Sequence, residues 1–367
     1  MTRFAAPGGY ANTPVTGRGV GAVNIGGRLV GEGQRVLIIA EAGVNHDGNV
    51  DRARRMIDVA VDAGADMVKF QMFRAAELVT ATADAASYQK AAGASSQREM
   101  LARLELSDAD FASLAAHCRS RGIAFLATPF SPPDVARLVR LGVPAIKLAS
   151  TDLNNPWLVR PASDTGLPLI VSTGAATADE IATAVERLKA WGAGARLILL
   201  HCISGYPAPL AEANLRALAT LRQVGGVPCG FSDHTESTAI AGWAVAAGAC
   251  VLEKHFTLDR GSAGPDHAMS LEPRQLREYV AAARDAETAL GNGVLGMSAV
   301  EADVRAVARK SVVAAVAIPA GTKVTEVMLT VKRPGGGIAP DQLELVVGRH
   351  AVVNIAPDTV LTWDHVQ

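Results

Sequence analysis

Polar residues that could perform chemistry follow several short apolar runs of the sequence. The string GFSDHT at residues 230–235 places a serine, an aspartate, a histidine and a threonine where an apolar run ends, and LEKH at 252–255 ends in a histidine. Such clustering indicates one shared site. Five of the eight histidines fall just after an apolar run or in the segment that follows it, namely His46, His201, His234, His255 and His267.

Strand periodicity sorts the residues of these two segments into faces. Side chains two positions apart point to the same side of a strand, and direct neighbours point to opposite sides. The predicted faces are therefore Ser232, His234, Glu253 and His255 on one side, and Asp233 and Lys254 on the other.

The two histidines predict a metal site. If their strands are neighbours, His234 and His255 lie close together where both strands end. Two imidazoles, a nearby carboxylate and water suit a divalent ion such as Mn²⁺ or Mg²⁺, and the oxygen-rich surroundings argue against a sulfur-ligated metal. The alternative is that each histidine only hydrogen-bonds a neighbouring loop.

Two lysines stand inside otherwise apolar runs, where an unpaired charge is costly. Lys69 and Lys147, with the hydroxyls of Ser150, Ser172 and Ser232, describe a pocket for phosphate, or for phosphate plus carboxylate. Two alternatives stay open: the lysines extend outward between helices, or one of them is a Schiff-base nucleophile.

Eight short apolar runs alternate with segments of helical periodicity, and these elements must position the polar residues. Eight such units over about 250 residues predict a (β/α)8 barrel, whose functional residues lie at the carboxyl ends of its strands. A doubly wound open sheet is the alternative, but the first turn, EAGVNHDG, is not a glycine-rich phosphate loop. The runs cover residues 36–40, 67–70, 123–127, 145–149, 168–172, 196–202, 227–231 and 250–255, and the main helical segments 50–63, 108–121, 133–141, 177–191, 215–223 and 273–290.

Segments with a different composition flank the predicted barrel. Short valine runs separated by PAG, PGGG and APDT near the end of the chain are typical of a compact all-β unit. We expect four parts: a tail and small hairpin at 1–34, the barrel at 35–290, a linker with one short helix at 291–308, and the β unit at 309–367.

Composition excludes several classes of function. The chain has 367 residues, of which 49% are hydrophobic, and a formal charge of −1, so it offers no basic field for nucleic acid. Its four cysteines show no CxxC spacing and indicate reduced, buried thiols. No apolar stretch reaches membrane length, and no signal-peptide core follows the first residues, so we expect a cytoplasmic protein without membrane contact.

The ordered motifs resemble the N-acetylneuraminate (sialic acid) synthase family, and the C-terminal unit resembles its antifreeze-like (SAF) domain. The resemblance covers about residues 22–367 and rests on EAGVNHDG, VKFQ, ATPFS, IKLAS, STG, HCISGYP, GFSDHT, LEKHFTLD and GPDHAMSLEP. It implies metal-dependent condensation of phosphoenolpyruvate with an N-acetylated aminosugar, such as N-acetylmannosamine, to a nine-carbon 2-keto acid and phosphate. No lysine forms a covalent adduct in the implied reaction.

The resemblance also implies roles for individual residues. Glu41 matches an acidic residue near the reacting carbons, for proton transfer or for orienting water, and Tyr206 and Asp266 match positions that contact the sugar. His234 and His255 match the metal ligands. The positions that hold phosphoenolpyruvate are Lys69, Lys147, Ser150, Ser172 and Ser232. Gln71, two residues beyond Lys69, completes the predicted substrate-binding set, and Glu41, Lys69, Lys147 and His255 form the predicted catalytic set.

Arg333, in KRPGGGI, matches the arginine that the antifreeze-like domain inserts into the barrel of a second subunit, which implies a domain-swapped homodimer. Departures from the family pattern concern the sugar: Met72, Gly205 and the alanine-rich segment Ala81–Ser96. The acceptor therefore stays open between N-acetylmannosamine and the diacetamido-dideoxy hexoses that lead to legionaminic or pseudaminic acid.

Overall fold

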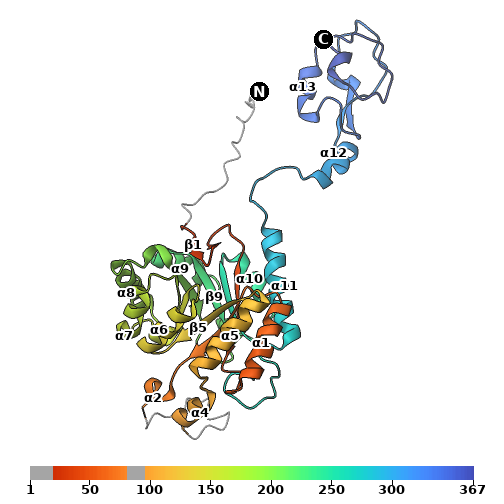
Figure 1. The fold of residues 1–367 in the computed structure, drawn as a ribbon. Helices are drawn as coiled ribbons and strands as arrows, with labels where there is room; N and C mark the ends of the chain where they lie inside the picture. Colours follow the sequence, from red (N-terminus) through yellow and green to blue (C-terminus); the bar gives the residue numbers. More distant parts are fainter. Residues whose placement is uncertain (1–19, 81–95) are drawn as a thin grey trace. The chain divides into compact units, whose positions relative to one another are not determined.

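The computed structural model describes residues 20–80 and 96–367 (Figure 1). The first 19 residues and the alanine-rich segment up to residue 95 lie outside the described part of the chain. Two compact units divide the described residues, one ending at Asn292 and the other beginning at Gly293.

The larger unit is built on a sheet of eight parallel strands in the order β5-β4-β3-β10-β9-β8-β7-β6. The last strand pairs with the first, because β10 lies in register with β3, and β5 and β6 lie side by side where the circle closes. The predicted (β/α)8 barrel is confirmed, and the open doubly wound sheet is wrong. The strands are β3 Leu37–Gly43, β4 Met67–Met72, β5 Ala124–Pro129, β6 Ile146–Leu148, β7 Leu169–Ser172, β8 Leu197–Cys202, β9 Cys229–Asp233 and β10 Val251–His255.

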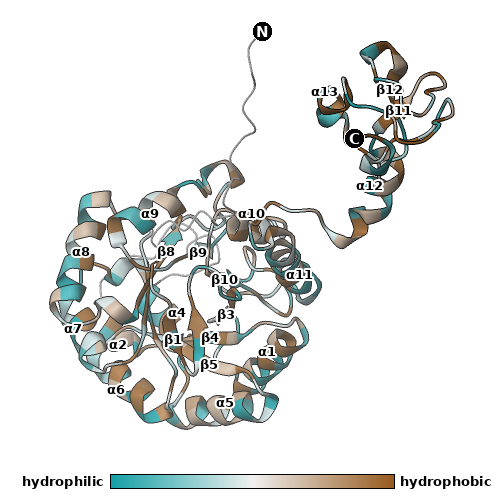
Figure 2. Ribbon diagram, turned by 90° about the horizontal axis from the view of Figure 1, so that it is seen from above, coloured by the Kyte–Doolittle hydropathy of each residue, from teal (hydrophilic) through white to brown (hydrophobic). Residues whose placement is uncertain are grey.

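Helices form a ring around these strands, which Figure 2 shows from above with hydrophobic residues concentrated on the strands. Local signals set the helix ends: Ser107 and Asp110 form a capping box before α5, and Gly122 ends that helix in the left-handed conformation. The helices of this unit are α1 Val50–Asp62, α2 Ala75–Leu78, α4 Gln97–Leu104, α5 Asp108–Arg121, α6 Pro132–Leu141, α7 Pro156–Asp164, α8 Ala178–Ala190, α9 Ala217–Gly225, α10 Ile240–Ala246 and α11 Pro273–Leu290.

Alternation along the strands separates two apolar layers. Side chains that point outward pack against the helices, as Ile38 and Phe231 do. Those that point inward fill the lower part of the barrel, and the hairpin of β1 (Val23–Ile25) and β2 (Arg28–Val30) packs onto them. The inward layer consists of Leu37, Ile39, Met67, Leu126, Ala145, Ile170, Ile198, Leu200, Cys250 and Val251.

The smaller unit consists of short, paired extended segments around its own core. α12 (Ala302–Ala308) comes first, β11 (Ser311–Ala314) pairs antiparallel with β12 (Leu329–Lys332), and α13 (Leu343–Val346) follows. Isolated bridges join further segments of this unit. Its buried side chains include Val312, Ile318, Ile338, Ile355 and Leu361.

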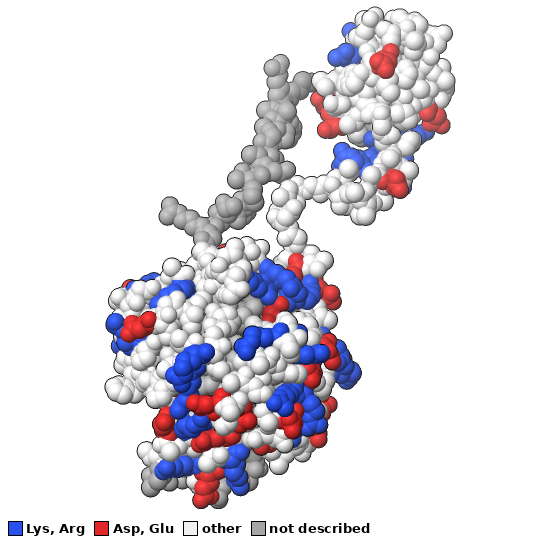
Figure 3. Space-filling model, viewed as in Figure 1, with Lys and Arg blue, Asp and Glu red and all other residues white. Residues whose placement is uncertain are grey.

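Charges of both signs are mixed over the face of the barrel unit that Figure 3 shows, in keeping with the formal charge of −1. Within residues 20–80 and 96–367, no helix is both long and apolar enough to cross a membrane.

Candidate active site

A buried polar cluster occupies the barrel directly above its inward apolar layer. The same alternation that points Ile39, Met67 and Val251 into the barrel also points Glu41, Lys69 and Glu253 inward, two residues further along their strands. Outward extension of the two lysines is therefore wrong. The inward polar side chains at this level are Glu41, Lys69, Thr128, Lys147, Ser172, Ser232 and Glu253, and all are buried.

Lys69 connects three strands. Its Nζ lies 3.0 Å from Glu41 Oε2 and 3.7 Å from Glu253 Oε2. It also donates a hydrogen bond of 2.8 Å to Thr128 Oγ1. The ammonium group is thus fixed between β3, β5 and β10.

Lys147 lies on β6, two strands along the barrel from the β4 strand that carries Lys69. Its Nζ donates hydrogen bonds to Ser172 Oγ at 2.6 Å and to the Leu148 carbonyl at 2.9 Å. It lies 3.7 Å from Glu253 Oε1, which accepts a hydrogen bond of 2.9 Å from Ser232 Oγ. Glu253 therefore joins both lysines through its two oxygens.

Burial and neighbouring charges shift the pKa values of these groups in different directions. Burial raises the pKa of Glu41 to about 7, although Lys69 opposes the shift. Burial also disfavours the charged form of Glu253, but Lys147 and Lys69 outweigh it and lower the pKa of that carboxyl. For Lys147, burial lowers the pKa. The cluster thus holds one ionised carboxylate and one carboxyl that can bind or release a proton near neutral pH.

The two histidines lie beside this cluster. The His234 and His255 ring centroids are 5.4 Å apart, and the Tyr206 ring lies 4.4 Å from that of His234. His234 Nδ1 lies 2.8 Å from the Ile203 carbonyl, so Nδ1 carries the proton and donates it there. That bond leaves His234 Nε2 as the nitrogen able to bind a ligand.

Asp266 extends the cluster from the loop after β10. Its Oδ2 lies 4.0 Å from His255 Nδ1, and burial raises the pKa of its carboxyl to about 6. Gly43 lies beneath these groups with φ 54°, and a Cβ there would come within 3.5 Å of Asp266, Glu41 and His255. A glycine at this position keeps space open between the three side chains.

The two histidines could supply two of the ligands of a divalent ion. Burial lowers the pKa of His255 well below its ordinary value, so this imidazole is neutral, as a metal ligand must be. Across the described ranges 20–80 and 96–367, no group of three or more His, Cys, Asp or Glu side chains is arranged to hold an ion. Two imidazoles would therefore need water or substrate oxygens to complete the coordination of an ion such as Mn²⁺ or Mg²⁺.

The structure brings most of the predicted site residues together but not all of them. Ser150 lies at the edge of the cluster, where its Oγ accepts a hydrogen bond of 2.9 Å from Gly174 N. Gln71 is partly buried on the face of β4 that carries Lys69. Arg333 belongs to the C-terminal unit, where it follows β12 and is exposed.

Sequence reasoning gave no role to Glu253 in the cluster, or to Cys202 beside it. The alternation of β10 places Glu253 on the face of His255, and this signal could have identified it as the bridge between the lysines. Cys202 also points inward, with Sγ 3.7 Å from His234 Nδ1. No pattern in the sequence marked this cysteine.

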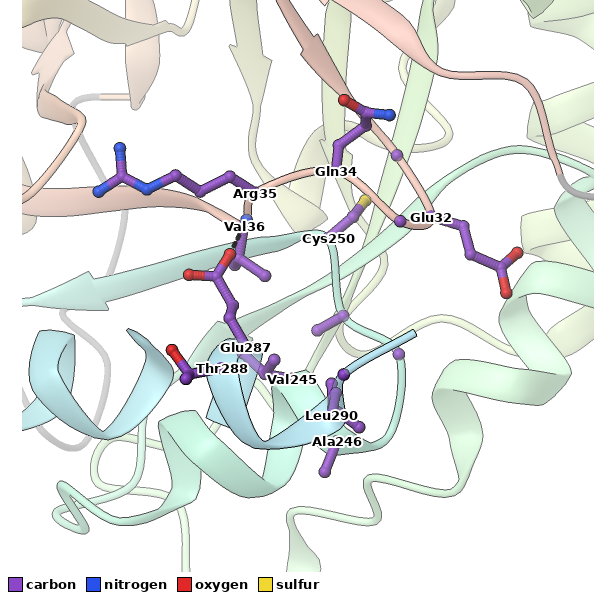
Figure 4. A pocket seen from close by; sticks show the side chains of 15 residues that line it. Glu32, Gln34, Arg35, Val36, Val245, Ala246, Cys250, Glu287, Thr288 and Leu290 are labelled. Atoms are coloured by element: carbon purple, nitrogen blue, oxygen red, sulfur yellow. Dashed lines mark hydrogen bonds between the residues drawn. The ribbon is translucent and has the colours of Figure 1, made fainter. Parts of the chain in front are cut away.

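A cavity of about 530 Å³ lies at the opposite end of the barrel, before β3 and β10 (Figure 4). Its lining includes Glu32, Arg35, Cys250 and Glu287 but no lysine or histidine. Glu287 accepts a hydrogen bond from Val36 N, so its carboxylate has a partner within the fold. The buried lysines and histidines of the candidate site lie instead at the carboxyl ends of the strands.

The fold and this site define a (β/α)8-barrel protein that has buried ion pairs at the carboxyl ends of its strands. A separate small unit follows at the C-terminus. The NeuB family model matches residues 56–295 and the SAF domain model residues 309–367. The chain belongs to the NeuB family, and its last unit is a SAF domain. The sequence resemblance to sialic acid synthases is thereby confirmed.

Individual relatives agree with this assignment. The chain is 39% identical to the N,N'-diacetyllegionaminic acid synthase of Legionella pneumophila, over 92% of this chain and 96% of that protein. It is 40% identical to the protein of the same name from Campylobacter jejuni, over 89% and 99%. The crystal structure of N-acetylneuraminic acid (sialic acid) synthetase from Leptospira borgpetersenii, in complex with citrate, matches with a TM-score of 0.70 and 36% identity, over 78% of this chain and 95% of that chain.

Proposed function

We propose that the protein condenses phosphoenolpyruvate with a 2,4-diacetamido-dideoxy hexose and water, and forms a nine-carbon 2-keto-3-deoxy sugar acid and phosphate. The reaction class follows from the family: the protein is an enzyme of the sialic acid synthase type that forms a carbon–carbon bond. Support for the diacetamido acceptor comes from the two relatives named N,N'-diacetyllegionaminic acid synthase. N-Acetylmannosamine is the alternative acceptor.

The observation that carries the proposal is the placement of two buried ammonium groups around one carboxylate. Lys69 and Lys147 lie 3.7 Å from different oxygens of Glu253, with the hydroxyls of Thr128 and Ser172 beside them. A trianionic ligand such as phosphoenolpyruvate needs fixed positive charge in a site that excludes water. The two lysines supply that charge without reorganisation during the reaction.

The chain's own residues then have separate tasks. The lysines hold the carboxylate and phosphate of phosphoenolpyruvate, and the hydroxyls of Ser150, Ser172 and Ser232 add donors. Glu41 exchanges a proton with the water that adds to the substrate, because its pKa lies near 7. A divalent ion held by His234 and His255 would supply Lewis acidity toward the aldehyde oxygen of the sugar.

We further propose a homodimer in which Arg333 contacts the sugar bound in the partner's barrel. The exposed valines of the segment before and within α12 support an additional packing surface: Val300, Val304 and Val307 are 87%, 62% and 64% exposed. A cytoplasmic location is proposed because the cysteines, Cys118, Cys202, Cys229 and Cys250, are free and buried.

The test is phosphate release from metal-stripped protein given phosphoenolpyruvate, with and without Mn²⁺. Three parallel reactions contain the diacetamido hexose, N-acetylmannosamine or no acceptor. We expect metal-dependent phosphate with the diacetamido sugar at a higher kcat/KM than with N-acetylmannosamine. Preference for N-acetylmannosamine would overturn the acceptor, and silence with every sugar would overturn the reaction.

A further inference from the structure

A buried ion pair lies on the outer side of the barrel, directly behind the two histidines. Asp233 and Lys254 each precede a histidine in the sequence and point away from the active site. Lys254 Nζ lies 2.9 Å from Asp233 Oδ2, and the two side chains are 1% and 0% exposed. The pair joins the ends of β9 and β10.

Further contacts extend this pair to the turn after β9. Thr235 N donates a hydrogen bond of 2.8 Å to Asp233 Oδ1, and Lys254 Nζ donates one to the Thr235 carbonyl. The ammonium also lies 5.7 Å from the ring centroid of Tyr279 on α11. The Asp233–Lys254 pair with Thr235 and Tyr279, called the rear clamp below, therefore encloses the backbone on both sides of His234.

Stability alone does not account for the rear clamp. The surrounding outward layer is apolar and includes Phe231 and Leu252. Replacing a buried ion pair with packed apolar side chains is commonly neutral or stabilising, because two charges lose their hydration on burial. The presence of the buried ion pair is therefore better explained by a role in fixing the positions of neighbouring residues.

We infer that the rear clamp positions His234 and His255 for metal binding. His255 ends β10, but His234 lies one residue beyond the end of β9, so the β9–β10 ladder alone does not fix its backbone. The rear clamp fixes that turn from behind, while the Ile203 carbonyl orients the ring from the front. This inference rests on the proposed metal role of the two histidines.

The experiment measures Mn²⁺ binding to the full chain, without substrates, from the EPR signal of free Mn²⁺. The variant Asp233→Leu/Lys254→Met removes both charges and keeps apolar volume. We expect its Kd for Mn²⁺ to rise about 10-fold, in the range seen for groups that orient metal ligands. Its Tm in EDTA should stay equal to that of the wild type or rise.

Arg284→Met is the matched control. Arg284 also lies on α11 and forms an ion pair of 2.7 Å with Asp66, but at the other end of the barrel. This variant should lower Tm and leave the Kd for Mn²⁺ unchanged. Equal Mn²⁺ affinity of the wild type and the double variant would overturn the inference.

A milder variant decides the question if the double variant does not fold. Tyr279→Leu keeps both charges and removes the ring beside Lys254, and we expect a rise of a few-fold in the Kd for Mn²⁺; an unchanged Kd would overturn the inference. If the wild type itself binds no Mn²⁺, the proposed metal role fails and this inference fails with it, whereas the test of phosphate release reports on the reaction separately.

Discussion

The Lys69 ammonium lies 3.0 Å from a carboxylate oxygen of Glu41 inside the barrel. An ion pair would ordinarily keep a carboxyl strongly acidic, yet burial dominates here and raises the pKa of Glu41 to about 7. The negative charge of Glu253, which shares Lys69, adds to this rise of the Glu41 pKa. Glu41 is therefore able to change protonation during turnover at neutral pH.

The pKa of Glu41 predicts a pH dependence of stability. A carboxyl whose pKa is raised from 4.5 to about 7 on folding contributes most below pH 4.5, and this contribution declines as pH rises to about 7. The free energy of unfolding of the wild type minus that of Glu41→Gln should therefore fall between these two pH values and level off above them. Urea titrations across pH 4 to 9 measure this difference.

Glu180→Gln is the control for that series. Hydrogen bonds from Thr177 lower the pKa of Glu180, so its contribution is lost only as pH falls below the ordinary value of 4.5. The difference between wild type and this variant should stay flat from pH 5 upward. A flat difference for Glu41→Gln would contradict the raised pKa.

Lys147 should act through its charge. Lys147→Met is expected to lower kcat/KM for phosphoenolpyruvate by about 10²- to 10³-fold, as loss of one preorganised donor does. Lys189→Met, which removes an exposed lysine paired with Glu186, should leave this value unchanged. Borohydride treatment with either substrate should not label Lys147; labelling would support a Schiff base instead.

Removal of metal should stop the reaction reversibly. EDTA is expected to abolish phosphate release, and Mn²⁺ or Mg²⁺ to restore it. Mutation of a group that orients a metal ligand weakens metal binding by about 10- to 100-fold. His255→Ala removes a ligand itself, so it should weaken Mn²⁺ binding by more than that. His117→Ala, which removes a hydrogen bond to Asp58 on the outer helices, is the control with unchanged affinity. Full activity in EDTA would contradict the metal site.

Mixed dimers test the proposed homodimer, in which the subunits would exchange their C-terminal units. Arg333→Ala and Lys147→Met homodimers are each expected to be nearly inactive when the acceptor is below its KM. In a heterodimer, the intact barrel of one subunit would receive the intact Arg333 of the other, so about half of the wild-type activity should return. Co-expression with two affinity tags isolates this heterodimer. No recovery would place Arg333 in its own barrel.

Gly230 should be intolerant of any side chain. A Cβ at this position in β9 would meet the Val251 carbonyl, and it would lie 2.7 Å from Leu200 Cδ2. Gly230→Ala should destabilise the protein by about 1–3 kcal/mol or more. At Gly205 the nearest atom to an added Cβ lies 3.7 Å away, so Gly205→Ala should change stability by less than about 0.5 kcal/mol. Chemical denaturation compares the two variants.

The sequence was enough to predict the barrel and the side of each strand to which a residue points, because alternation along a strand is a local property. It placed Asp233 and Lys254 opposite to His234 and His255, as the structure does. It could not show that Glu253 bridges two lysines, since that depends on distances between strands far apart in the sequence. The sequence also could not show that Nδ1 of His234 carries the proton, because the group that accepts it is a backbone carbonyl.

The hairpin of β1 and β2 gives the barrel a solid floor, since Val23, Ile25 and Val30 pack onto the inward apolar layer. Within the described residues, this apolar floor separates Lys69 and Lys147 from the amino ends of the strands, so we expect reactants to enter from the carboxyl ends. A reactant bound at the depth of the lysines is expected to arrive before a second molecule occupies the space near the histidines. We therefore expect an order of binding in which the reactant held by the lysines enters first.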